Sequence, residues 1–299
     1  MMLAEGVAEA QQTNAGFASP DAAAEYWAHG TQDTDERTLS FAGADGNMRE
    51  ARLYPTAARR GKATSDGTLL FIHGGGWAGG SIPLNHRACR LISAQSGWDV
   101  LSISYRLAPD HPYPAGLEDC RAAYRWLRAS GRANGWNIDR IALGGASAGG
   151  NLALSLALSL DYAISGLLLF YPVTSDDFGT DSYTRYAEGF GLGRARMQEL
   201  FDLYDPGKRR ATDAAITPLS TPVEVIRAAA LPPTSIIAAE CDVLADDSRK
   251  MALRLQDAGV PVDLHIEPGV THGFINRGRL IPAADACLTR AATYLESLT

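Results

Sequence analysis

The residues around Ser147 have a spacing that could present a serine hydroxyl as a nucleophile. Gly145-Ala146-Ser147-Ala148-Gly149 fits G-x-S-x-G, a sharp strand-to-helix turn that holds the hydroxyl above a sheet. Because the chain has 30 glycines among 299 residues, a chance match is a real risk. The context favours the functional interpretation, since an apolar run at 141–143 precedes the motif and a helix-forming run at 151–154 follows it.

A serine hydroxyl is a weak nucleophile at neutral pH, so it needs a base and an acid that orients the base. Asp242 follows the apolar run that ends near Ala239, and His272 follows the run that ends near Ile266. Of the six histidines, only His272 follows the last of these runs in a glycine-flanked loop. The order serine, aspartate, histidine is that of α/β-hydrolases and predicts acyl transfer through a serine nucleophile.

Other acids and histidines compete for the same roles. Asp246 and Asp247 directly precede the helix expected from Ser248, so they are better explained as its N-cap and first turn. Glu240 is a weaker alternative for the acid. His111 lies among prolines, where a rigid loop is the simpler explanation.

A run of glycines could supply donors for the oxyanion of a tetrahedral intermediate. His73-Gly74-Gly75-Gly76-Trp77 follows an apolar run, and consecutive glycines let backbone N–H groups point at a ligand with no side chain in the way. One further donor is expected from Ala148, the residue after the serine. The stretch also fits the dinucleotide pattern G-x-G-x-x-G, but Gly80 and Pro83 argue against the helix that this pattern must open.

These residues can meet only if the apolar runs form a sheet that brings their ends together. Apolar runs alternate with helix-like stretches from about Thr68 to the C-terminus, which is typical of a mostly parallel sheet covered on both faces. The predicted strands are Leu69–Ile72, Val100–Tyr105, Ile138–Leu143, Leu167–Tyr171, Ser235–Ala239 and Val262–Ile266. The predicted helices are Leu117–Ala129, a helix from just after Ser147 to Leu160, Ser248–Ala258 and Ala283–Leu298.

Two regions depart from this alternation. Residues 1–45 are expected to form one or two short helices, Ala22–His29 among them, before an outer hairpin. Residues 174–230, rich in aromatic and charged side chains, are expected to be an insertion between two strands. An insertion at the carboxyl edge of a parallel sheet is usually a lid or part of a pocket, and surface helices without a binding role are the alternative.

With these motifs, the sequence resembles the hormone-sensitive-lipase-like family, the bacterial acetyl esterase and carboxylesterase branch of the α/β-hydrolases. The resemblance spans about Thr68 to Phe274. It is specific because five motifs recur in order: His73 to Trp77, Tyr105 to Pro109 with Tyr113 to Ala115, Gly144 to Gly150, Glu240 to Leu244 with Asp246, and His272 to Phe274.

The resemblance implies an α/β fold, with residues 46–299 as the α/β-hydrolase domain. It implies a helical cap made of an N-terminal cap segment, residues 1–45, and a cap insertion at about 174–230. Ala146 is a departure, because family members usually carry an acidic residue or threonine before the serine, and Asp110 stands where glutamate is usual. Neither departure removes a catalytic group.

The resemblance also implies a role for each motif residue. Ser147 corresponds to the nucleophile, His272 to the base and Asp242 to the acid. Gly75 and Gly76, with Gly74 nearby, would join Ala148 in the oxyanion hole.

The predicted function is a serine carboxylesterase that hydrolyses short-chain acyl esters of small molecules through an acyl-enzyme intermediate. This chemistry needs no metal and no cofactor. The alternatives are an amidase or formamidase that uses the same triad, and a non-catalytic small-molecule-binding protein of the same fold, which the presence of His272 disfavours. Trp77, Phe201 and Phe274 are predicted to bind the substrate, and further aromatic candidates are Phe178, Phe190 and Tyr204.

Composition narrows the possible partners and the compartment. The net charge of −7 argues against a nucleic-acid partner, and the apolar runs are far shorter than the ~20 residues of a membrane span. The first residues lack the pattern of a secretory signal, so a cytoplasmic protein is expected. Four cysteines without C-x-x-C spacing are expected to be reduced thiols. The family resemblance leaves a homodimer as one option for assembly.

Overall fold

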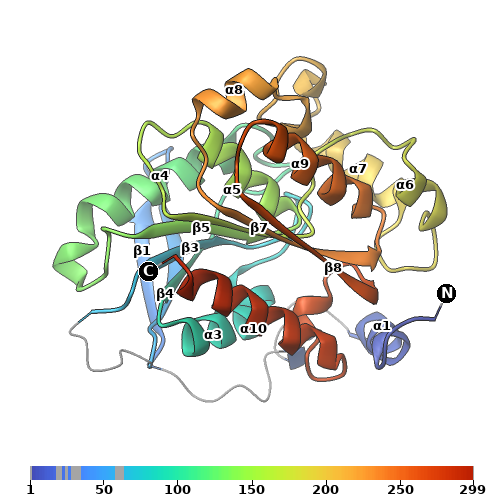
Figure 1. Cartoon of the computed structure of the whole chain (residues 1–299), viewed down its shortest axis with the longest axis horizontal. Helices are drawn as coiled ribbons and strands as arrows, with labels where there is room; N and C mark the ends of the chain where they lie inside the picture. The colour runs from blue at the N-terminus through green and yellow to red at the C-terminus, as the bar shows by residue number, and fades with distance from the viewer. Residues whose placement is uncertain (1, 18–21, 24–25, 28–34, 58–63, 299) are drawn as a thin grey trace.

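A computed structural model describes residues 2–17, 22–23, 26–27, 35–57 and 64–298, and an eight-stranded sheet forms its centre (Figure 1). The strand order is β1-β2-β4-β3-β5-β6-β7-β8. β2 pairs antiparallel with β1 and with β4, and the other neighbours pair parallel, so the sheet is mostly parallel as predicted. The strands are β1 (Arg37–Ala42), β2 (Met48–Tyr54), β3 (Thr68–Ile72), β4 (Asp99–Ile103), β5 (Ile141–Ala146), β6 (Gly166–Phe170), β7 (Thr234–Cys241) and β8 (Val262–Thr271).

The six predicted strands are all present, with ends that differ by a few residues. Strands β3, β4, β5 and β6 are buried along their whole length, which explains why they are continuous apolar runs in the sequence. β1 and β2 form the expected outer hairpin, where exposed and buried residues mix.

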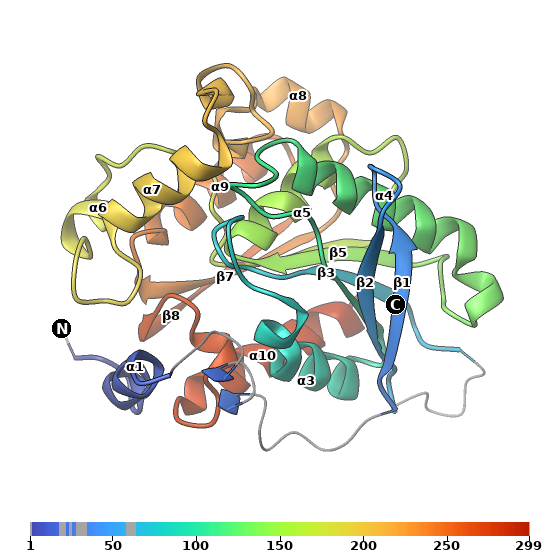
Figure 2. The same ribbon diagram turned by 180° about the vertical axis from the view of Figure 1, so that it is seen from behind.

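Helices cover both faces of the sheet (Figures 1 and 2). One face carries α3 (His86–Ser96) and α10 (Pro282–Glu296), which contact each other. The other face carries α4 (Ala115–Ser130), α5 (Ala148–Leu158) and α9 (Ala245–Asp257). Each face therefore has its own apolar core.

The four predicted helices are present as α4, α5, α9 and α10, whereas α3 was not predicted. α9 begins three residues before its predicted start at Ser248, so Asp246 and Asp247 lie in its first turn as expected. On α4, the residues Leu117, Cys120, Tyr124 and Leu127 follow the helical repeat and form one buried apolar stripe.

Short helices outside the sheet lie near the end where β8 terminates (Figures 1 and 2). α1 of the N-terminal segment lies there together with α6 and α7 of the insertion. β1 falls within residues 1–45, so the sheet takes in the last part of the segment expected to be a cap. The helix expected over Ala22–His29 lies partly outside the described residues. The bounds are α1 (Val7–Ala15), α6 (Asp181–Arg185), α7 (Arg194–Tyr204) and α8 (Val223–Ala228).

All four cysteines are buried, and no disulfide bond joins any two of them. Burial raises the pKa of the Cys89 and Cys120 thiols, which keeps both of them protonated. Among the helices described, none combines the length and the apolar character needed to cross a lipid bilayer.

Candidate active site

The sharp turn predicted around Ser147 joins β5 to α5. Ser147 has a φ of 57°, a conformation that side-chain-bearing residues rarely adopt. Its amide donates to the carbonyl of Phe170 at 2.9 Å, which ties the turn to β6. A Cβ atom on Gly149 would lie 2.1 Å from the carbonyl oxygen of Ile72, so only glycine fits this close approach of helix and strand. The strained backbone thereby presents the Ser147 hydroxyl at the end of the sheet.

The three residues predicted to act together are in contact. His272 Nε2 lies 2.9 Å from Ser147 Oγ, and His272 Nδ1 lies 2.6 Å from Asp242 Oδ2. The second carboxylate oxygen of Asp242 accepts the amide of Leu244 at 3.0 Å, which fixes its orientation. The Asp242 side chain has no exposed surface, whereas Ser147 is 7% exposed. This arrangement can move a proton from the serine to the imidazole while the buried carboxylate holds the ring.

The competing acids are held in other roles. Glu240 accepts the amide of Gly269 at 2.8 Å, and Asp246 accepts the amide of Ser182 at 2.9 Å. Asp247 is buried and accepts the amides of Thr174 and Ser175 at 2.7 and 2.9 Å. These carboxylates hold backbone loops, and Asp242 is the acid that contacts His272.

The buried carboxyl of Asp247 is expected to make the stability of the fold depend on pH. Burial raises the pKa of its carboxyl from 3.8 to about 7. Between these values the folded chain keeps a proton that the unfolded chain has released, so the stabilisation is full below the unfolded pKa and is lost as the pH rises towards 7. Asp247→Asn keeps an acceptor for the two amides and removes the titration. We expect the melting temperature of the wild type to fall relative to this variant between pH 5 and pH 8, and a difference independent of pH would contradict the raised pKa.

His73 and Asn85 shape the glycine loop. His73 is buried, and burial lowers its pKa to about 4, so it is neutral at pH 7. Its ring stacks on Tyr105 with centroids 4.4 Å apart. Asn85 accepts the amide of Gly74 at 3.4 Å and donates to Asn276 at 3.0 Å, which ties the glycine loop to the segment after His272.

The amides predicted to hold an oxyanion lie beside Ser147. Gly75 and Gly76 line the same cavity as Ser147, and Ala148 is the first residue of α5, where helix amides have no intrahelical partner. Within the described part of the chain, no acceptor is recorded for the amides of Gly75, Gly76 or Ala148. A Cβ atom on Gly76 would lie 2.5 Å from Leu200, so a side chain there would collide with α7. The glycines thus leave unpaired N–H groups next to the serine.

A cavity of about 270 Å³ opens at Ser147 and His272. Both segments expected to form a cap contribute to it: Trp27 comes from the N-terminal segment, and Met197 and Leu200 come from α7. Other residues line the cavity but were not predicted from the sequence: Asn14, Ala23, Leu84, Asn85, Tyr171, Leu192, Arg196, Asn276 and Arg277.

The aromatic residues predicted to bind substrate lie elsewhere, since none of Trp77, Phe201 and Phe274 is among the lining residues. Trp77 stacks on Tyr204 with centroids 4.4 Å apart and lies 5.1 Å from the Phe201 ring, so these rings pack the insertion against the body of the protein. Phe274 is fully buried and lies 5.9 Å from the ring of Tyr171. The further candidates Phe178, Phe190 and Tyr204 also do not line the cavity.

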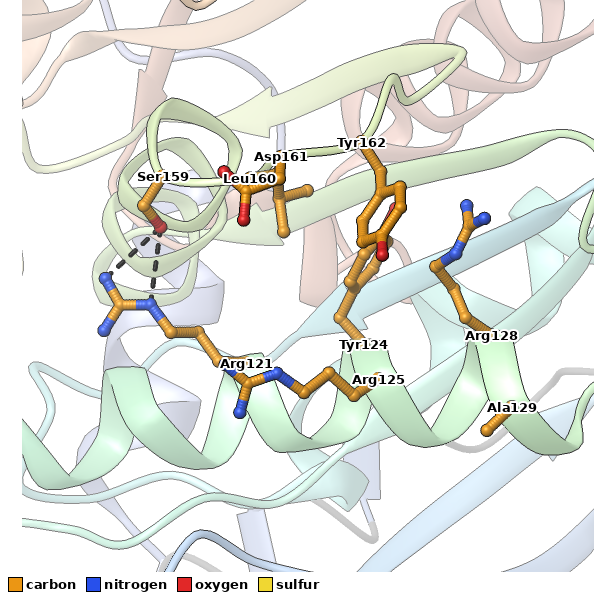
Figure 3. A pocket seen from close by; sticks show the side chains of 9 residues that line it. All are labelled: Arg121, Tyr124, Arg125, Arg128, Ala129, Ser159, Leu160, Asp161 and Tyr162. Carbon is orange, nitrogen blue, oxygen red and sulfur yellow. Dashed lines mark hydrogen bonds between the residues drawn. The ribbon is translucent and has the colours of Figure 1, made fainter.

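A second cavity lies between α4 and the chain that follows α5, away from these residues (Figure 3). Arg121 donates to the hydroxyl of Ser159 at its edge, and the guanidinium of Arg128 lies 4.6 Å from the ring centre of Tyr162. It contains none of the predicted site residues.

One group of described residues has the ligand types and spacing for a metal ion. The ligand atoms of His265, Glu267 and Cys287 lie within 4.8 Å of one another, on β8 and α10. None of the three lines the cavity at Ser147, so a metal held there would have no direct contact with the serine.

The chain is similar to several known ester hydrolases. Carboxylesterase NlhH from Mycobacterium tuberculosis is 35% identical over 232 residues, which cover 76% of this chain and 72% of that protein. Ethyl acetate hydrolase from Pseudomonas putida is 33% identical over 263 residues, which cover 86% and 81%. The solved structure of an ester hydrolase from the metagenome of Lake Arreo, in complex with a bipyridine phosphonate derivative, is 28% identical, with a TM-score of 0.87 over 99% of both chains.

A family model described as the alpha/beta hydrolase fold matches residues 69–276. This match begins in β3 and ends at Asn276, so it includes the glycine loop, the turn at Ser147 and the segments of Asp242 and His272. The chain belongs to the α/β-hydrolase fold family, in the hormone-sensitive-lipase-like branch that also holds these carboxylesterases.

Proposed function

We propose that the protein is a serine carboxylesterase in which Ser147, His272 and Asp242 are the catalytic triad. The observation that carries the proposal is the continuous contact from Ser147 Oγ through His272 to Asp242, at 2.9 and 2.6 Å. Ester hydrolysis is also the chemistry in the names of relatives that are 33–35% identical to the chain.

In the first half of the reaction, Ser147 Oγ attacks the ester carbonyl while His272 Nε2 takes its proton. The carbonyl oxygen becomes an oxyanion, which the amides of Gly75, Gly76 and Ala148 stabilise. Loss of one such donor lowers transition-state stabilisation by ~2.7–4 kcal/mol. His272 then passes the proton to the leaving alcohol, and the acyl group stays on Ser147.

In the second half, His272 takes a proton from water, and the resulting nucleophile attacks the acyl-enzyme. Collapse of the second tetrahedral intermediate releases the carboxylic acid and returns the proton to Ser147. Asp242 keeps the imidazole in the tautomer with a proton on Nδ1, so that Nε2 is free to accept in both halves.

The nucleophile can be tested without knowledge of the substrate. A fluorophosphonate probe is expected to label the protein on Ser147, because the serine oxygen displaces fluoride from phosphorus and the phosphonylated serine is not hydrolysed as an acyl-enzyme is. Intact mass and peptide mapping measure the site. Labelling at another serine, or equal labelling of heat-unfolded protein, would contradict the assignment.

We also propose that the substrate is a small ester with a short acyl chain and that the segments within 1–45 and 174–230 act as its cap. The cavity volume of about 270 Å³ and the lining by Trp27, Met197 and Leu200 support both points. A cytoplasmic location and a homodimer stay predictions.

Leu200 allows the acyl-chain preference to be tested. We expect p-nitrophenyl acetate or butyrate to be the best substrate of the wild type, and Leu200→Ala to shift the optimum towards longer chains, because this side chain lies against Gly76 in the cavity. The variant is also expected to be less stable by about 2–5 kcal/mol. Values of kcat/KM across the ester series measure the shift, with Leu253→Ala, at an exposed position, as the control. Highest efficiency of the wild type on long-chain esters would contradict the short-acyl proposal.

A further inference from the structure

The cavity beside Ser147 carries positive charge and no carboxylate. Arg196 and Arg277 line it, and among its described lining residues there is no aspartate or glutamate. Arg196 is exposed and pairs with Glu199 at 2.6 Å, so its charge is balanced at the surface. Ala146 adds only a methyl group at the position where the family resemblance leads one to expect an acid or a threonine.

Arg277 is the charge that lacks a partner. Across the residues that the structure describes, its guanidinium has no hydrogen bond or ion pair, although the side chain is partly buried. Burial lowers the pKa of Arg277, and an arginine nevertheless stays charged at pH 7. A Cβ atom built on Gly273 would lie 3.9 Å from Arg277 Nη2, so the guanidinium is close to the loop that carries His272. A cation without a protein partner therefore lines the cavity next to the loop that carries His272.

Tyr171 contributes a hydroxyl donor without a partner to the same cavity. Its side chain lines the cavity, is 1% exposed, and its hydroxyl has no hydrogen-bond partner among the described residues. Its ring lies 4.6 Å from the ring of His272. Burial raises the pKa of Tyr171, so the hydroxyl keeps its proton, and the charge of Arg277, which lines the same cavity, acts in the opposite direction. A φ of 36° at Tyr171 is strained, as is common where a side chain is held for function.

We propose that Arg277 and Tyr171 form a subsite for a carboxylate on the substrate, which makes this protein an esterase for small anionic esters. A carboxylate is acceptor-only and would accept from both the guanidinium and the hydroxyl, so one group satisfies two donors that are otherwise unpaired. The proposal rests on the proposed function, because Ser147 must cleave the ester bond. The substrates are short esters with a carboxylate a few bonds from the ester carbonyl, either half esters of dicarboxylic acids or O-acyl hydroxy acids.

The proximity of Arg277 to the His272 loop suits either source of the carboxylate. In a half ester the carboxylate belongs to the acyl group and stays on Ser147 after the first step. In an O-acyl hydroxy acid the carboxylate leaves with the alcohol, which His272 protonates. Parallel assays with monoethyl succinate and with O-acetyl lactate distinguish the two. A higher kcat/KM for monoethyl succinate places the carboxylate in the acyl half of the ester, and a higher kcat/KM for O-acetyl lactate places it in the alcohol half.

The proposal is tested with a ratio that a general loss of activity does not change. We expect kcat/KM for monoethyl succinate, or for O-acetyl lactate, to exceed that for the neutral ethyl ester of the same acid. We expect Arg277→Gln to lower this ratio at least tenfold for the preferred compound, and Arg277→Lys to lower it less. Arg279→Gln is the matched control, because this neighbouring arginine lies over the ring of Tyr26 and does not line the cavity. An unchanged ratio in Arg277→Gln would overturn the subsite.

Two further measurements keep the test decisive if Arg277→Gln folds poorly or if the esters are not cleaved. Tyr171→Phe removes a hydroxyl without a partner, so we expect an unchanged or higher melting temperature together with a lower ratio. Calorimetric binding of monoethyl succinate and of O-acetyl lactate to Ser147→Ala, with and without Arg277→Gln, reports the subsite without turnover. At least tenfold weaker binding of one compound to the double variant than to Ser147→Ala supports the subsite even where ester hydrolysis fails. If each compound binds equally to the two variants, the subsite is overturned.

Discussion

Replacement of Ser147 by alanine is expected to lower kcat/KM for a short-chain ester by roughly a thousandfold to a millionfold. The change removes the oxygen that lies 2.9 Å from His272 Nε2 and that we propose as the nucleophile. The amides of Gly75, Gly76 and Ala148 remain and still polarise a bound carbonyl, so some activity above that of water is expected to persist. Turnover of p-nitrophenyl acetate at saturating and limiting concentration measures the loss.

Alanine at this position should leave the fold intact. The backbone bonds of the turn, from the Ser147 amide to Phe170 and from the Asn151 amide to Ser147, do not involve the side chain. Ser155→Ala on the same helix is the matched control, because its hydroxyl donates to the carbonyl of Ala215 at 2.7 Å. That variant should lose about 1 kcal/mol of stability and keep its activity. Activity of Ser147→Ala within tenfold of the wild type would show that another residue is the nucleophile.

The positions of the triad could be predicted because each residue follows a buried strand. Strands β5, β7 and β8 run parallel to their neighbours, so their carboxyl ends lie along one edge of the sheet. Residues far apart in sequence, such as Ser147 and His272, are then brought together by topology alone. The continuous apolar runs and the glycine-rich turn were sufficient to locate this edge.

Helix α3 was not predicted because its buried face mixes apolar residues with arginines and serines, which hides the apolar pattern in the sequence. Arg87 and Arg90 are each 8% exposed, and Arg87 is buried through a salt bridge to Asp285 of α10 at 2.7 Å. A charge becomes compatible with the interior only when the partner helix supplies the opposite charge. The partner is nearly two hundred residues away in the chain, so no local pattern reveals it.

The lining of the cavity also could not be predicted, because it depends on the direction of individual side chains. Trp77 and Tyr171 both have positive φ angles, of 57° and 36°. Trp77 directs its ring into the packing with Tyr204, whereas Tyr171 lines the cavity beside His272. An aromatic residue near a catalytic motif can therefore be a packing residue or a lining residue here, and only the tertiary structure separates the two.

Replacement of Asp242 by asparagine is expected to lower kcat for ester hydrolysis by roughly ten-thousandfold. Asparagine has the same shape, and its oxygen can still accept the Leu244 amide that Asp242 accepts at 3.0 Å. Its NH₂ group then faces His272 Nδ1 and donates to it, which favours the tautomer with the proton on Nε2. That nitrogen can no longer accept the proton of Ser147. Initial rates at saturating p-nitrophenyl acetate measure the effect, and an unchanged melting temperature shows that it is not caused by unfolding.

Asp246→Asn tests whether Asp242 alone supplies the acid, because Asp246 belongs to the same motif and is four residues away. Its carboxylate accepts the amide of Ser182 at 2.9 Å and pairs with Arg249 at 3.1 Å, so asparagine there should weaken loop contacts and change kcat by less than about tenfold. If the two variants lost activity equally, the loss would come from a general disturbance of this loop and not from the contact of Asp242 with His272. A large loss confined to Asp242→Asn would instead be explained by the 2.6 Å contact between Asp242 and His272. The two substitutions remove the same charge, but only the one at position 242 changes the atom that faces the imidazole.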